Sequence, residues 1–328
     1  MFNGKKILIT GGTGSLGQAL TERLLKQDVD TIRIFSRNEH KQISMESKFQ
    51  DDRLRFFIGD IRDYNRLTRA FEDIDIVFHA AALKHVPVIE YNPFEAIKTN
   101  VLGSQNVIDA CLYENVEKAI CIGTDKAVSP LNTYGATKLL MEKLFVTANN
   151  YTNPERHKTK FLAIRYGNVL GSSGSVVPTL LKQIKSDREI TITDPKMTRF
   201  NITMNQALDF IIRSLEKGKG GEVFIPKLKA YSLGDLKDVI LERLEKDVKT
   251  KIISVRSGEK YHESLISAEE IRNTYDDNED YVIVQDITKT KNSNLKQASL
   301  TNQYSSDKVE LLSKEELKQI LIKEELLS

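Results

Sequence analysis

The first half of the chain alternates short apolar runs with longer segments of mixed polarity. Runs such as KKILIT (5–10) and KAICIG (118–123) are rich in β-branched residues and are bounded by turn signals, which is typical of strands buried on both faces of a sheet. The same pattern predicts strands at 31–36, 54–59, 74–79 and 160–166, and helices at 15–27, 38–49, 63–71, 93–114 and 134–150. Such alternation predicts an α/β fold with a doubly wound parallel sheet.

The pattern changes after Tyr166. A Gly/Ser-rich loop, GNVLGSSGSVVP, is followed by predicted helices at 175–186, 204–217, 231–246 and 314–326, and by predicted strands at 190–193, 222–226 and 251–255. The polar stretch 285–309 is either a long surface excursion or partly disordered. We predict a nucleotide-binding unit made of 1–170 and 200–230, and a smaller capping lobe with a C-terminal extension made of 171–199 and 231–328.

Composition narrows the class of protein. The chain has 328 residues, 40% of them hydrophobic and 29% charged, and a formal net charge of +2, which is ordinary for a globular protein and favours neither nucleic acid nor an anionic membrane as partner. No apolar run reaches the ~18 residues that span a bilayer, and the N-terminus is unlike a signal peptide. Cys111 and Cys121 are predicted to be reduced core thiols of a cytoplasmic protein. His85 has no second His or Cys at metal-ligand spacing, so no metal site is predicted.

A glycine loop joins the first predicted strand to the first predicted helix. In ITGGTGSLGQAL, Gly11, Gly14 and Gly17 permit a tight turn and a close approach of the backbone to a pyrophosphate at a helix N-terminus. A merely structural turn is the alternative. The strand before the loop and the helix after it favour a dinucleotide cofactor.

The end of the second strand distinguishes NADP from NAD. An NAD enzyme usually has an acidic residue there, whereas this chain has Ser36 and Arg37, which suit a 2′-phosphate. The alternative is that Arg37 is a solvated surface residue and that Glu39 binds the ribose. We predict NADP. The residues predicted to bind it are Gly11, Thr13, Gly14, Ser15, Leu16, Gly17, Ser36, Arg37, Asn38, Lys41, Asp60, Ile61, Ala80, Ala81, Ala82, Lys84, Tyr134, Lys138 and Val169.

Tyr134 and Lys138 form a candidate redox pair. They are four residues apart, so both lie on one face of the predicted helix 134–150. The lysine cation favours the phenolate, which can take a hydroxyl proton as hydride leaves the same carbon. Thr124, at the end of the fifth strand, can hydrogen-bond the same substrate oxygen. We predict that all three residues are catalytic.

Further short motifs accompany the glycine loop and the Tyr-Lys pair. From residue 5 onward they are KKILITGGTGSLG, AALKHVP, NPFEAIKTN, TDKA, YGATK, RYGNV, GSVVP, ITDPKMTRF and RSGEK. With these motifs the chain resembles the extended short-chain dehydrogenase/reductase superfamily, and more specifically the inverting UDP-N-acetylglucosamine 4,6-dehydratases of pseudaminic acid synthesis. The resemblance extends from residue 5 to about residue 267, and nothing is recognised beyond residue 285. One departure from the family is Ser173, where the family usually has arginine.

The resemblance implies a Rossmann fold with a smaller C-terminal substrate lobe, UDP-N-acetylglucosamine as substrate, and two catalytic pairs. Oxidation at sugar carbon 4 acidifies the proton on carbon 5, water is lost across carbons 5 and 6, and hydride returns to carbon 6. Asp125 fits the acid that assists the leaving hydroxyl, and Lys126 the base at carbon 5. Lys126 must then be neutral, which burial beside Lys138 and a cationic nicotinamide would favour. A surface ion pair is the alternative interpretation of Asp125 and Lys126.

The resemblance also implies substrate contacts and partners. Arg199 and Arg256 are the expected clamps for the diphosphate. A homo-oligomer is expected, with a hexamer as one candidate form, and the product would enter pseudaminic acid synthesis for surface or flagellin glycosylation. The full set of implied substrate contacts is Lys84, Asn168, Val177, Arg199, Arg256 and Glu259.

Three other functions share part of this pattern. A retaining dehydratase would carry Asp-Glu where this chain has Asp125 and Lys126, and a sugar C4-epimerase would lack that acid-base pair. A protein that binds NADP as a redox sensor would be expected to have a broken Thr-Tyr-Lys set, and here the set is intact.

Overall fold

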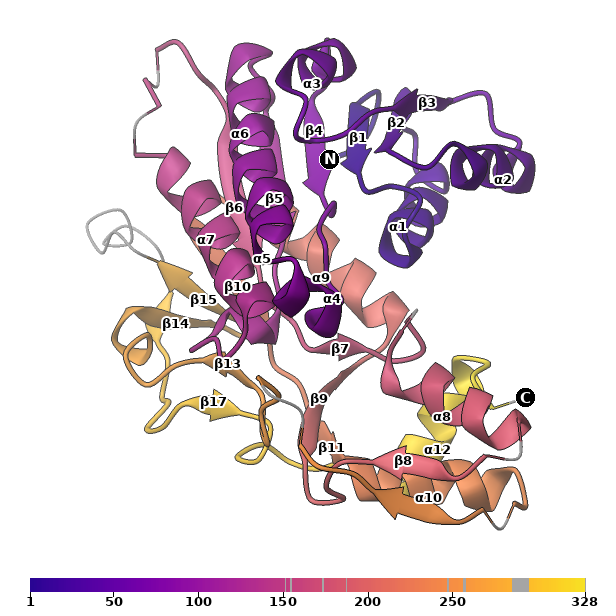
Figure 1. Ribbon diagram of the computed structural model, residues 1–328. Helices are drawn as coiled ribbons and strands as arrows, with labels where there is room; N and C mark the ends of the chain where they lie inside the picture. The colour runs from indigo at the N-terminus through magenta and orange to yellow at the C-terminus, as the bar shows by residue number, and fades with distance from the viewer. Residues whose placement is uncertain are drawn as a thin grey trace.

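A large twisted sheet forms the centre of the molecule (Figure 1). The computed structural model describes residues 1–150, 152–153, 155–172, 174–186, 188–246, 248–255, 258–284 and 295–327. Within this part of the chain the sheet has ten strands, and the seven from β3 to β10 run parallel. In spatial order the strands are β16 (Lys296–Gln297), β14 (Thr274–Asp277), β15 (Asp280–Val284), β10 (Glu222–Pro226), β6 (Lys160–Ile164), β5 (Lys118–Ile122), β4 (Ile76–His79), β1 (Lys6–Thr10), β2 (Thr31–Ser36) and β3 (Leu54–Ile58).

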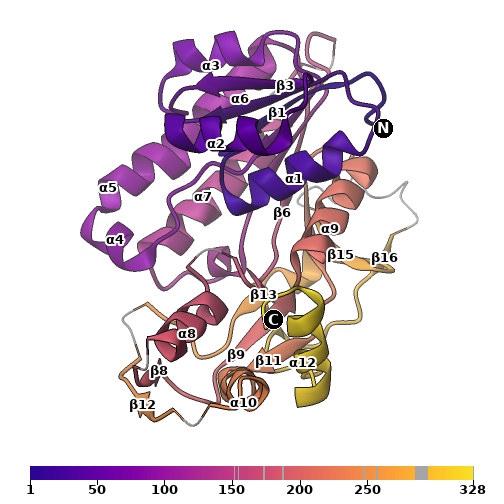
Figure 2. The ribbon, with the colours of Figure 1, turned by 90° about the vertical axis from the view of Figure 1, so that its right-hand side faces the viewer.

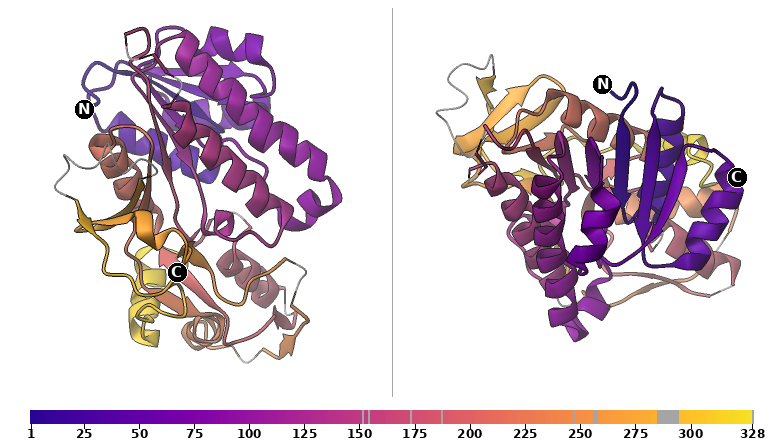
Figure 3. Two further views of the ribbon diagram at one scale, coloured as in Figure 1. Left: turned by 90° about the vertical axis from the view of Figure 1, so that its left-hand side faces the viewer. Right: turned by 90° about the horizontal axis from the view of Figure 1, so that it is seen from above.

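Helices cover both faces of this sheet (Figures 2 and 3). One face packs against α1 (Ser15–Leu25), α2 (Glu39–Phe49) and α9 (Met204–Lys217), through a core that includes Leu20 and Ile211. The other face packs against α3 (Tyr64–Phe71), α6 (Gly103–Tyr113) and α7 (Thr133–Ala148). The predicted α/β fold with a doubly wound parallel sheet is confirmed.

Local sequence signals explain where several helices begin. The Asn132 side chain accepts a hydrogen bond from the Gly135 amide (2.8 Å) and so caps α7. Capping boxes start α9 at Thr203 and α12 (Lys314–Lys323) at Ser313, each completed by the Gln or Glu three residues later. The segment 93–114, predicted as one helix, is instead α5 (Pro93–Ala96), a π-helical turn η1 (Ile97–Leu102) and α6. A further short helix, α4 (Val86–Tyr91), precedes them.

A smaller lobe lies at the carboxyl edge of the parallel strands (Figure 2). Its apolar core joins α8 (Val176–Lys185), α10 (Leu233–Arg243) and α12. Its short strands are β7 (Asn168–Val169), β9 (Thr198–Ile202) and β11 (Ala230–Ser232) in one sheet, β8 (Ile190–Ile192) with β12 (Thr250–Ile252), and β13 (Ser264–Ile266) with β17 (Tyr304–Ser305).

The chain beyond residue 230 divides differently from the prediction. That prediction placed all of 231–328 with the lobe, whereas β14, β15 and β16 extend the main sheet in antiparallel fashion beside β10. Residues 200–230 were predicted to belong to the large sheet. β10 joins that sheet and α9 packs on it, whereas β9, at the start of this range, lies in the small sheet. Residues 285–294 lie outside the described part of the chain, and the segment from 295 onward is ordered into β16, β17 and α12. Within that described part, no helix combines the length and the apolar character needed to cross a membrane.

Candidate active site

A cavity of about 1370 Å³ lies where the parallel strands meet the lobe. The ends of β1, β2, β4 and β5 form one side of it, and residues of α8, β8 and β9 contribute to the other. Every residue predicted to bind the cofactor lines this cavity, as do Thr124, Lys126, Lys84, Asn168, Arg199 and Glu259. One long pocket therefore joins the predicted cofactor site to most of the predicted catalytic and substrate residues.

The glycine loop has the geometry of an anion cradle. Gly11 has a φ of 68°, and a Cβ placed on it would lie 2.8 Å from the Cα of Ala81. A Cβ on Gly17 would lie 2.4 Å from the carbonyl oxygen of Gly12, so only glycine lets α1 begin this close to the loop. Gly14, the residue that precedes α1, provides no side-chain cap. The amides at the start of α1 are thus available to an anion, and these residues fit a dinucleotide pyrophosphate.

The end of β2 presents polar side chains to the same cavity. Ser36 is held by Gln42, whose amide donates to the Ser36 hydroxyl (3.0 Å). The side chain of Arg37 is 55% exposed and lies 3.8 Å from the Asp60 carboxylate. Glu39, the alternative ribose ligand, is in the first turn of α2 and is not among the residues that line the cavity.

Asn100 supports the loop that follows β4, and the sequence pattern did not single it out. Its side chain accepts a bond from the Leu83 amide (2.8 Å) and donates to the Leu83 carbonyl (3.0 Å) and the Thr137 hydroxyl (3.0 Å). It lies in the π-helical turn η1, a kind of irregularity often found at functional sites. Asn100 thereby ties the loop that carries Lys84 to helix α7.

Tyr134 and Lys138 both lie in α7 and line the cavity. Lys138 donates to the carbonyl oxygen of Ile122 at the end of β5 (2.5 Å), and burial lowers the pKa of this lysine to about 8. Burial also raises the pKa of Tyr134 to about 12, although the Lys126 ammonium and a hydrogen bond with Thr124 act in the opposite direction. Among the protein's own groups, Tyr134 is therefore a neutral phenol, with the Lys126 ammonium close enough to favour its phenolate.

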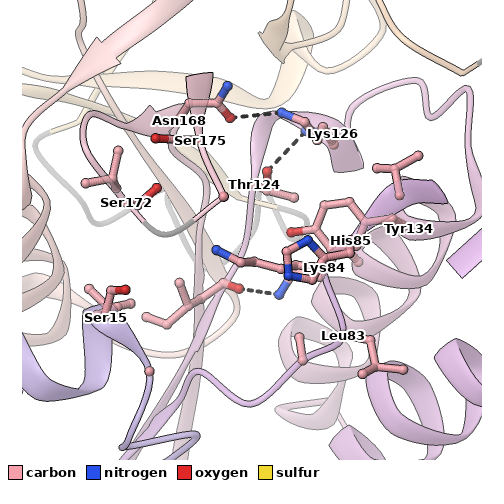
Figure 4. A pocket seen from close by; sticks show the side chains of 18 of the residues that line it. Ser15, Leu83, Lys84, His85, Thr124, Lys126, Tyr134, Asn168, Ser172 and Ser175 are labelled. Carbon is pink, nitrogen blue, oxygen red and sulfur yellow. Dashed lines mark hydrogen bonds between the residues drawn. The ribbon is translucent and has the colours of Figure 1, made fainter. Parts of the chain in front are cut away.

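Asp125 and Lys126 follow β5 in the turn η2 (Asp125–Ala127). The Lys126 ammonium donates to the side chain of Asn168 (3.0 Å; Figure 4) and to Asp125 Oδ1 (3.1 Å). Asp125 itself is fully buried behind the cavity wall, and its Oδ2 atom has no hydrogen-bond partner. The pair is therefore part of the site and is not a surface ion pair.

A neutral Lys126 was expected from the sequence, but the charged groups around this lysine favour its ammonium form. Burial alone would lower the pKa of this lysine, but the carboxylates of Asp125 and Glu263 outweigh burial and raise the pKa above its ordinary value. Burial and the Glu263 charge raise the pKa of Asp125, while Lys126 opposes that shift. Lys126 is thus a cation held between two carboxylates.

Glu263 is a functional candidate that the sequence analysis did not identify. It is 3% exposed, lines the cavity, and places Oε1 at 3.4 Å from the Lys126 ammonium. The sequence signal available for it was its position within residues 5–267, the range over which the chain resembles the dehydratases. Lys126, Arg199 and Lys260 together lower the pKa of Glu263 against the effect of burial.

The residues predicted to bind substrate do not all line the cavity. Arg199 is nearly buried and donates to the carbonyl oxygens of Thr198 (2.8 Å) and Tyr261 (3.0 Å) and to the Glu259 carboxylate (3.2 Å). Val177 packs in the apolar core of the lobe and is not among the residues that line the cavity. The predictions for Arg256 and Ser173 lie outside the described residues. Over the described residues, no group of three or more His, Cys, Asp or Glu side chains could hold a metal.

The sequence of this chain is similar to a known family and to several known proteins. The model of the family described as "Polysaccharide biosynthesis protein" matches residues 7–286. A UDP-N-acetylglucosamine 4,6-dehydratase (inverting) of Campylobacter jejuni is 49% identical over 88% of this chain and 85% of its own length. An uncharacterised membrane protein of Methanocaldococcus jannaschii is 45% identical, and a UDP-glucose 4-epimerase of Rickettsia bellii is 41% identical, each over 98% of this chain and 96% of its own length.

Solved structures have the same architecture. Pen from Bacillus thuringiensis superposes with a TM-score of 0.93 at 39% identity and covers 100% of both chains. DesIV, a dTDP-glucose 4,6-dehydratase from Streptomyces venezuelae, gives a TM-score of 0.71 at 20% identity over 78% of this chain and 86% of its own. At that identity the second likeness supports the fold alone.

Proposed function

The chain belongs to the polysaccharide biosynthesis protein family, and from this membership and its site we propose that it is a UDP-N-acetylglucosamine 4,6-dehydratase, a hydro-lyase with NADP as cofactor. The observation that carries the proposal is that Tyr134, Lys138 and Lys126 line one cavity, with Asp125 buried directly behind Lys126 and hydrogen-bonded to it. Tyr134 and Lys138 suit a redox step, and Asp125 and Lys126 suit an elimination.

The protein's side chains have distinct tasks in this reaction. When bound, the nicotinamide would accept hydride from sugar carbon 4 and return hydride to carbon 6. Tyr134 takes the carbon 4 hydroxyl proton. Lys126 and Thr124 lower the pKa of Tyr134, and Lys138, one turn along α7, would also stabilise its phenolate. Lys126 removes the carbon 5 proton, while Asp125 gives a proton to the departing carbon 6 hydroxyl, which leaves as water. Arg199 is the described candidate for holding the diphosphate.

The ion pair between Asp125 and Lys126 suggests how base and acid arise together. Transfer of one proton from the Lys126 ammonium to the Asp125 carboxylate yields a neutral amine and a carboxylic acid, which are the forms that the elimination requires. The two groups are hydrogen-bonded at 3.1 Å, so no intervening water is needed. The raised pKa of Asp125, caused by burial and by Glu263, favours its protonated form.

The elimination pair can be tested in a double variant. Asp125→Asn with Lys126→Ala should abolish water loss from UDP-N-acetylglucosamine, measured by mass spectrometry, and leave cofactor and UDP-sugar binding largely intact. Each group contributes roughly 10²–10⁴-fold, without additivity. Asp238→Asn with Lys237→Ala is a matched control, because these adjacent residues also form an ion pair (2.8 Å) but lie on α10. Near-normal dehydration by the first double variant would reject the assignment.

We further propose inversion at carbon 5 and a role in pseudaminic acid synthesis. The support is the lysine at position 126, where a retaining enzyme would carry a glutamate that returns the proton to the same face. The expected product is UDP-2-acetamido-2,6-dideoxy-L-arabino-hexos-4-ulose, with deuterium at carbon 5 when the reaction is run in deuterated buffer. NMR couplings of the fresh product give the configuration, and a D-xylo product as the sole early species would reject inversion.

The cofactor proposal rests on Ser36 and Arg37, which line the cavity at the end of β2. Their hydroxyl and guanidinium groups suit a 2′-phosphate, whereas the carboxylate of Glu39 does not line the cavity. Denaturing the purified protein and analysing the released nucleotide by mass spectrometry should yield NADP or NADPH. Recovery of NAD alone would contradict this part of the proposal.

A UDP-sugar 4-epimerase is the second candidate, because the relative from Rickettsia bellii carries that name. Tyr134 and Lys138 would serve its redox step equally well, but Asp125 and Lys126 would then have no evident task. Incubation with UDP-glucose and UDP-N-acetylglucosamine separates the two. An epimerase gives a product of unchanged mass, and a dehydratase gives one that is lighter by one water.

We also propose a cytoplasmic homo-oligomer, with a hexamer as the candidate form. Cys111 and Cys121 are free and buried, which suits a reducing compartment. Val88, Tyr91 and Phe94 on α4 and α5 are each at least 61% exposed, and such a row of apolar side chains suits a contact between copies. Analytical ultracentrifugation should show an assembly, and a monomer at micromolar concentration would contradict it.

A further inference from the structure

Glu263 lies opposite Asp125 across the Lys126 ammonium. Its Oε1 atom is 3.4 Å from Lys126 Nζ, and the Asp125 Oδ1 atom is 3.1 Å from the same nitrogen. Both carboxylates are buried, and each has one oxygen, Glu263 Oε2 and Asp125 Oδ2, without a hydrogen-bond partner. Most buried polar atoms in folded proteins have a hydrogen-bond partner, so two unsatisfied carboxylate oxygens beside one ammonium mark this cluster as unusual.

We propose that Glu263 is a positioning residue for Lys126, fixing the ammonium in the cavity and controlling through its negative charge when that group releases a proton. The inference rests on the proposed role of Lys126 as base. It adds a third group to the elimination pair, one that acts through Lys126 without touching the reacting carbons.

The C-terminal extension holds Glu263 in place. The Glu263 amide donates to the Ser306 hydroxyl (3.0 Å), and the Ser306 amide donates to the Glu263 carbonyl (2.8 Å). Ser306 Oγ in turn lies 2.7 Å from the hydroxyl of Thr198, which also bonds His262 Nδ1 (2.8 Å). Since β17 pairs with β13 directly beside these contacts, the backbone of Glu263 has little freedom to move.

The charges around Lys126 explain why Glu263 matters for its protonation. Asp125 and Glu263 favour the ammonium, Arg199 opposes it, and a Tyr134 phenolate would favour it. Lys260 also lies close to both carboxylates and donates to the Val128 carbonyl. With Glu263 neutralised, Asp125 is the one remaining carboxylate within 4.0 Å of the ammonium among the described residues, so the lysine should release its proton at lower pH.

Titration of Lys126 tests this without relying on activity. In protein labelled with ¹³Cε-lysine, the Lys126 resonance is assigned by its loss in Lys126→Arg and followed against pH by NMR. Glu263→Gln, which keeps the shape and removes the charge, should lower the midpoint by about 1–3 pH units. Glu263→Asp, which keeps the charge, should retain a midpoint closer to that of the wild type. Glu279→Gln is the control, because that side chain is 66% exposed.

The pH profile of water loss gives the second readout. If Lys126 and Asp125 share one proton in the active form, kcat should fall at high pH when that proton is lost. This fall should move to lower pH in Glu263→Gln by a similar interval, and Glu263→Asp should move it back. A Lys126 resonance in Glu263→Gln that matches the wild type at every pH would overturn the inference. A shifted resonance in a protein that releases no water from the UDP-sugar would keep the positioning role and reject the proposed function instead.

Discussion

Two lysines that line the cavity have pKa values shifted in opposite directions, because their neighbours differ. Lys138 donates to the Ile122 carbonyl and contacts the Met141 sulfur, and burial lowers its pKa to about 8 although Cys121 and Glu142 act in the opposite direction. The Lys126 side chain is 22% exposed, and its pKa rises in spite of partial burial, because Asp125 and Glu263 contact it. In the proposed mechanism the two lysines would serve two purposes: Lys138 would favour the phenolate of Tyr134, and Lys126 would hold a proton until the elimination.

The lowered pKa of Lys138 predicts a pH-dependent stability. The folded state loses this proton near pH 8 and the unfolded chain near 10.5, so the full cost of burying the charge is present below pH 8 and is relieved as pH rises from 8 to 10.5. Lys138→Met, of similar length, should therefore unfold at higher urea concentration than wild type at pH 7, by about 1–3 kcal/mol, while losing activity. That advantage should shrink at pH 9.5.

Urea unfolding of both proteins at pH 7 and 9.5 checks this prediction. Loss of the hydrogen bond from Lys138 to the Ile122 carbonyl reduces the advantage at both pH values alike, so the difference between them is the informative quantity. A variant that is destabilised equally at pH 7 and 9.5 would contradict it.

At the scale of elements, irregular structure positions the chemistry. The π-helical turn η1 directs Asn100 at the Leu83 backbone, and the turn η2 directs Lys126 into the cavity while Asp125 remains behind the wall. Strand β17 does the same for Glu263 through Ser306. At each of these three places, hydrogen bonds that involve the backbone fix the position of a residue of the candidate site.

Ser306→Ala tests the link between the C-terminal extension and the site. It leaves the buried Glu263 amide and Thr198 hydroxyl each short of a partner, which should lower the free energy of unfolding by about 1–3 kcal/mol in urea titrations. The midpoint of Lys126 should fall in the same direction as in Glu263→Gln, but by less. Thr301→Ala, at an exposed position of the same segment, is the control. An unchanged Lys126 midpoint in Ser306→Ala would show that the extension does not act on this lysine.

At the scale of the whole molecule, two cores support the two sides of the cavity. The glycine cradle belongs to the sheet with its helices, whereas α8 and β8 belong to the lobe, whose core includes Leu317 and Leu321 of α12. Arg165, which follows β6, links two distant parts of the chain. Its guanidinium donates to Glu142 of α7 (2.6 Å) and to Glu270, which follows β13 (2.7 Å). Substrate and cofactor affinity should therefore depend on different parts of the chain.

A pair of core variants tests this division. Leu321→Ala and Leu67→Ala each truncate a fully buried leucine, the first in the lobe and the second in α3 beneath the sheet. Both should lose about 2–5 kcal/mol of stability by denaturant unfolding. Calorimetric titration should show weaker UDP-sugar binding in Leu321→Ala with nearly unchanged cofactor affinity, and no such selective loss in Leu67→Ala. Equal effects on both ligands in both variants would argue against separate supports.

Local patterns in the sequence were sufficient for much of this protein. The parallel strands, most helices, the glycine cradle and the sites of Tyr134, Lys138, Asp125 and Lys126 follow from apolar periodicity and short spacings. These features depend on neighbours a few residues away, or on the rule that parallel strands present their carboxyl ends at one edge. The predicted set of cofactor residues lines the cavity for that reason.

Only the tertiary structure decided the remaining features. Glu263, Ser306 and Asn100 act on residues distant along the chain, and no periodicity marks them, while Val177 has the right local motif but packs into the lobe core. The charge state of Lys126 also depends on which carboxylates the fold brings within 4.0 Å, because electrostatic effects follow distance in space and local burial. A sequence determines which groups are present, and the packing of distant segments determines which of them share a proton.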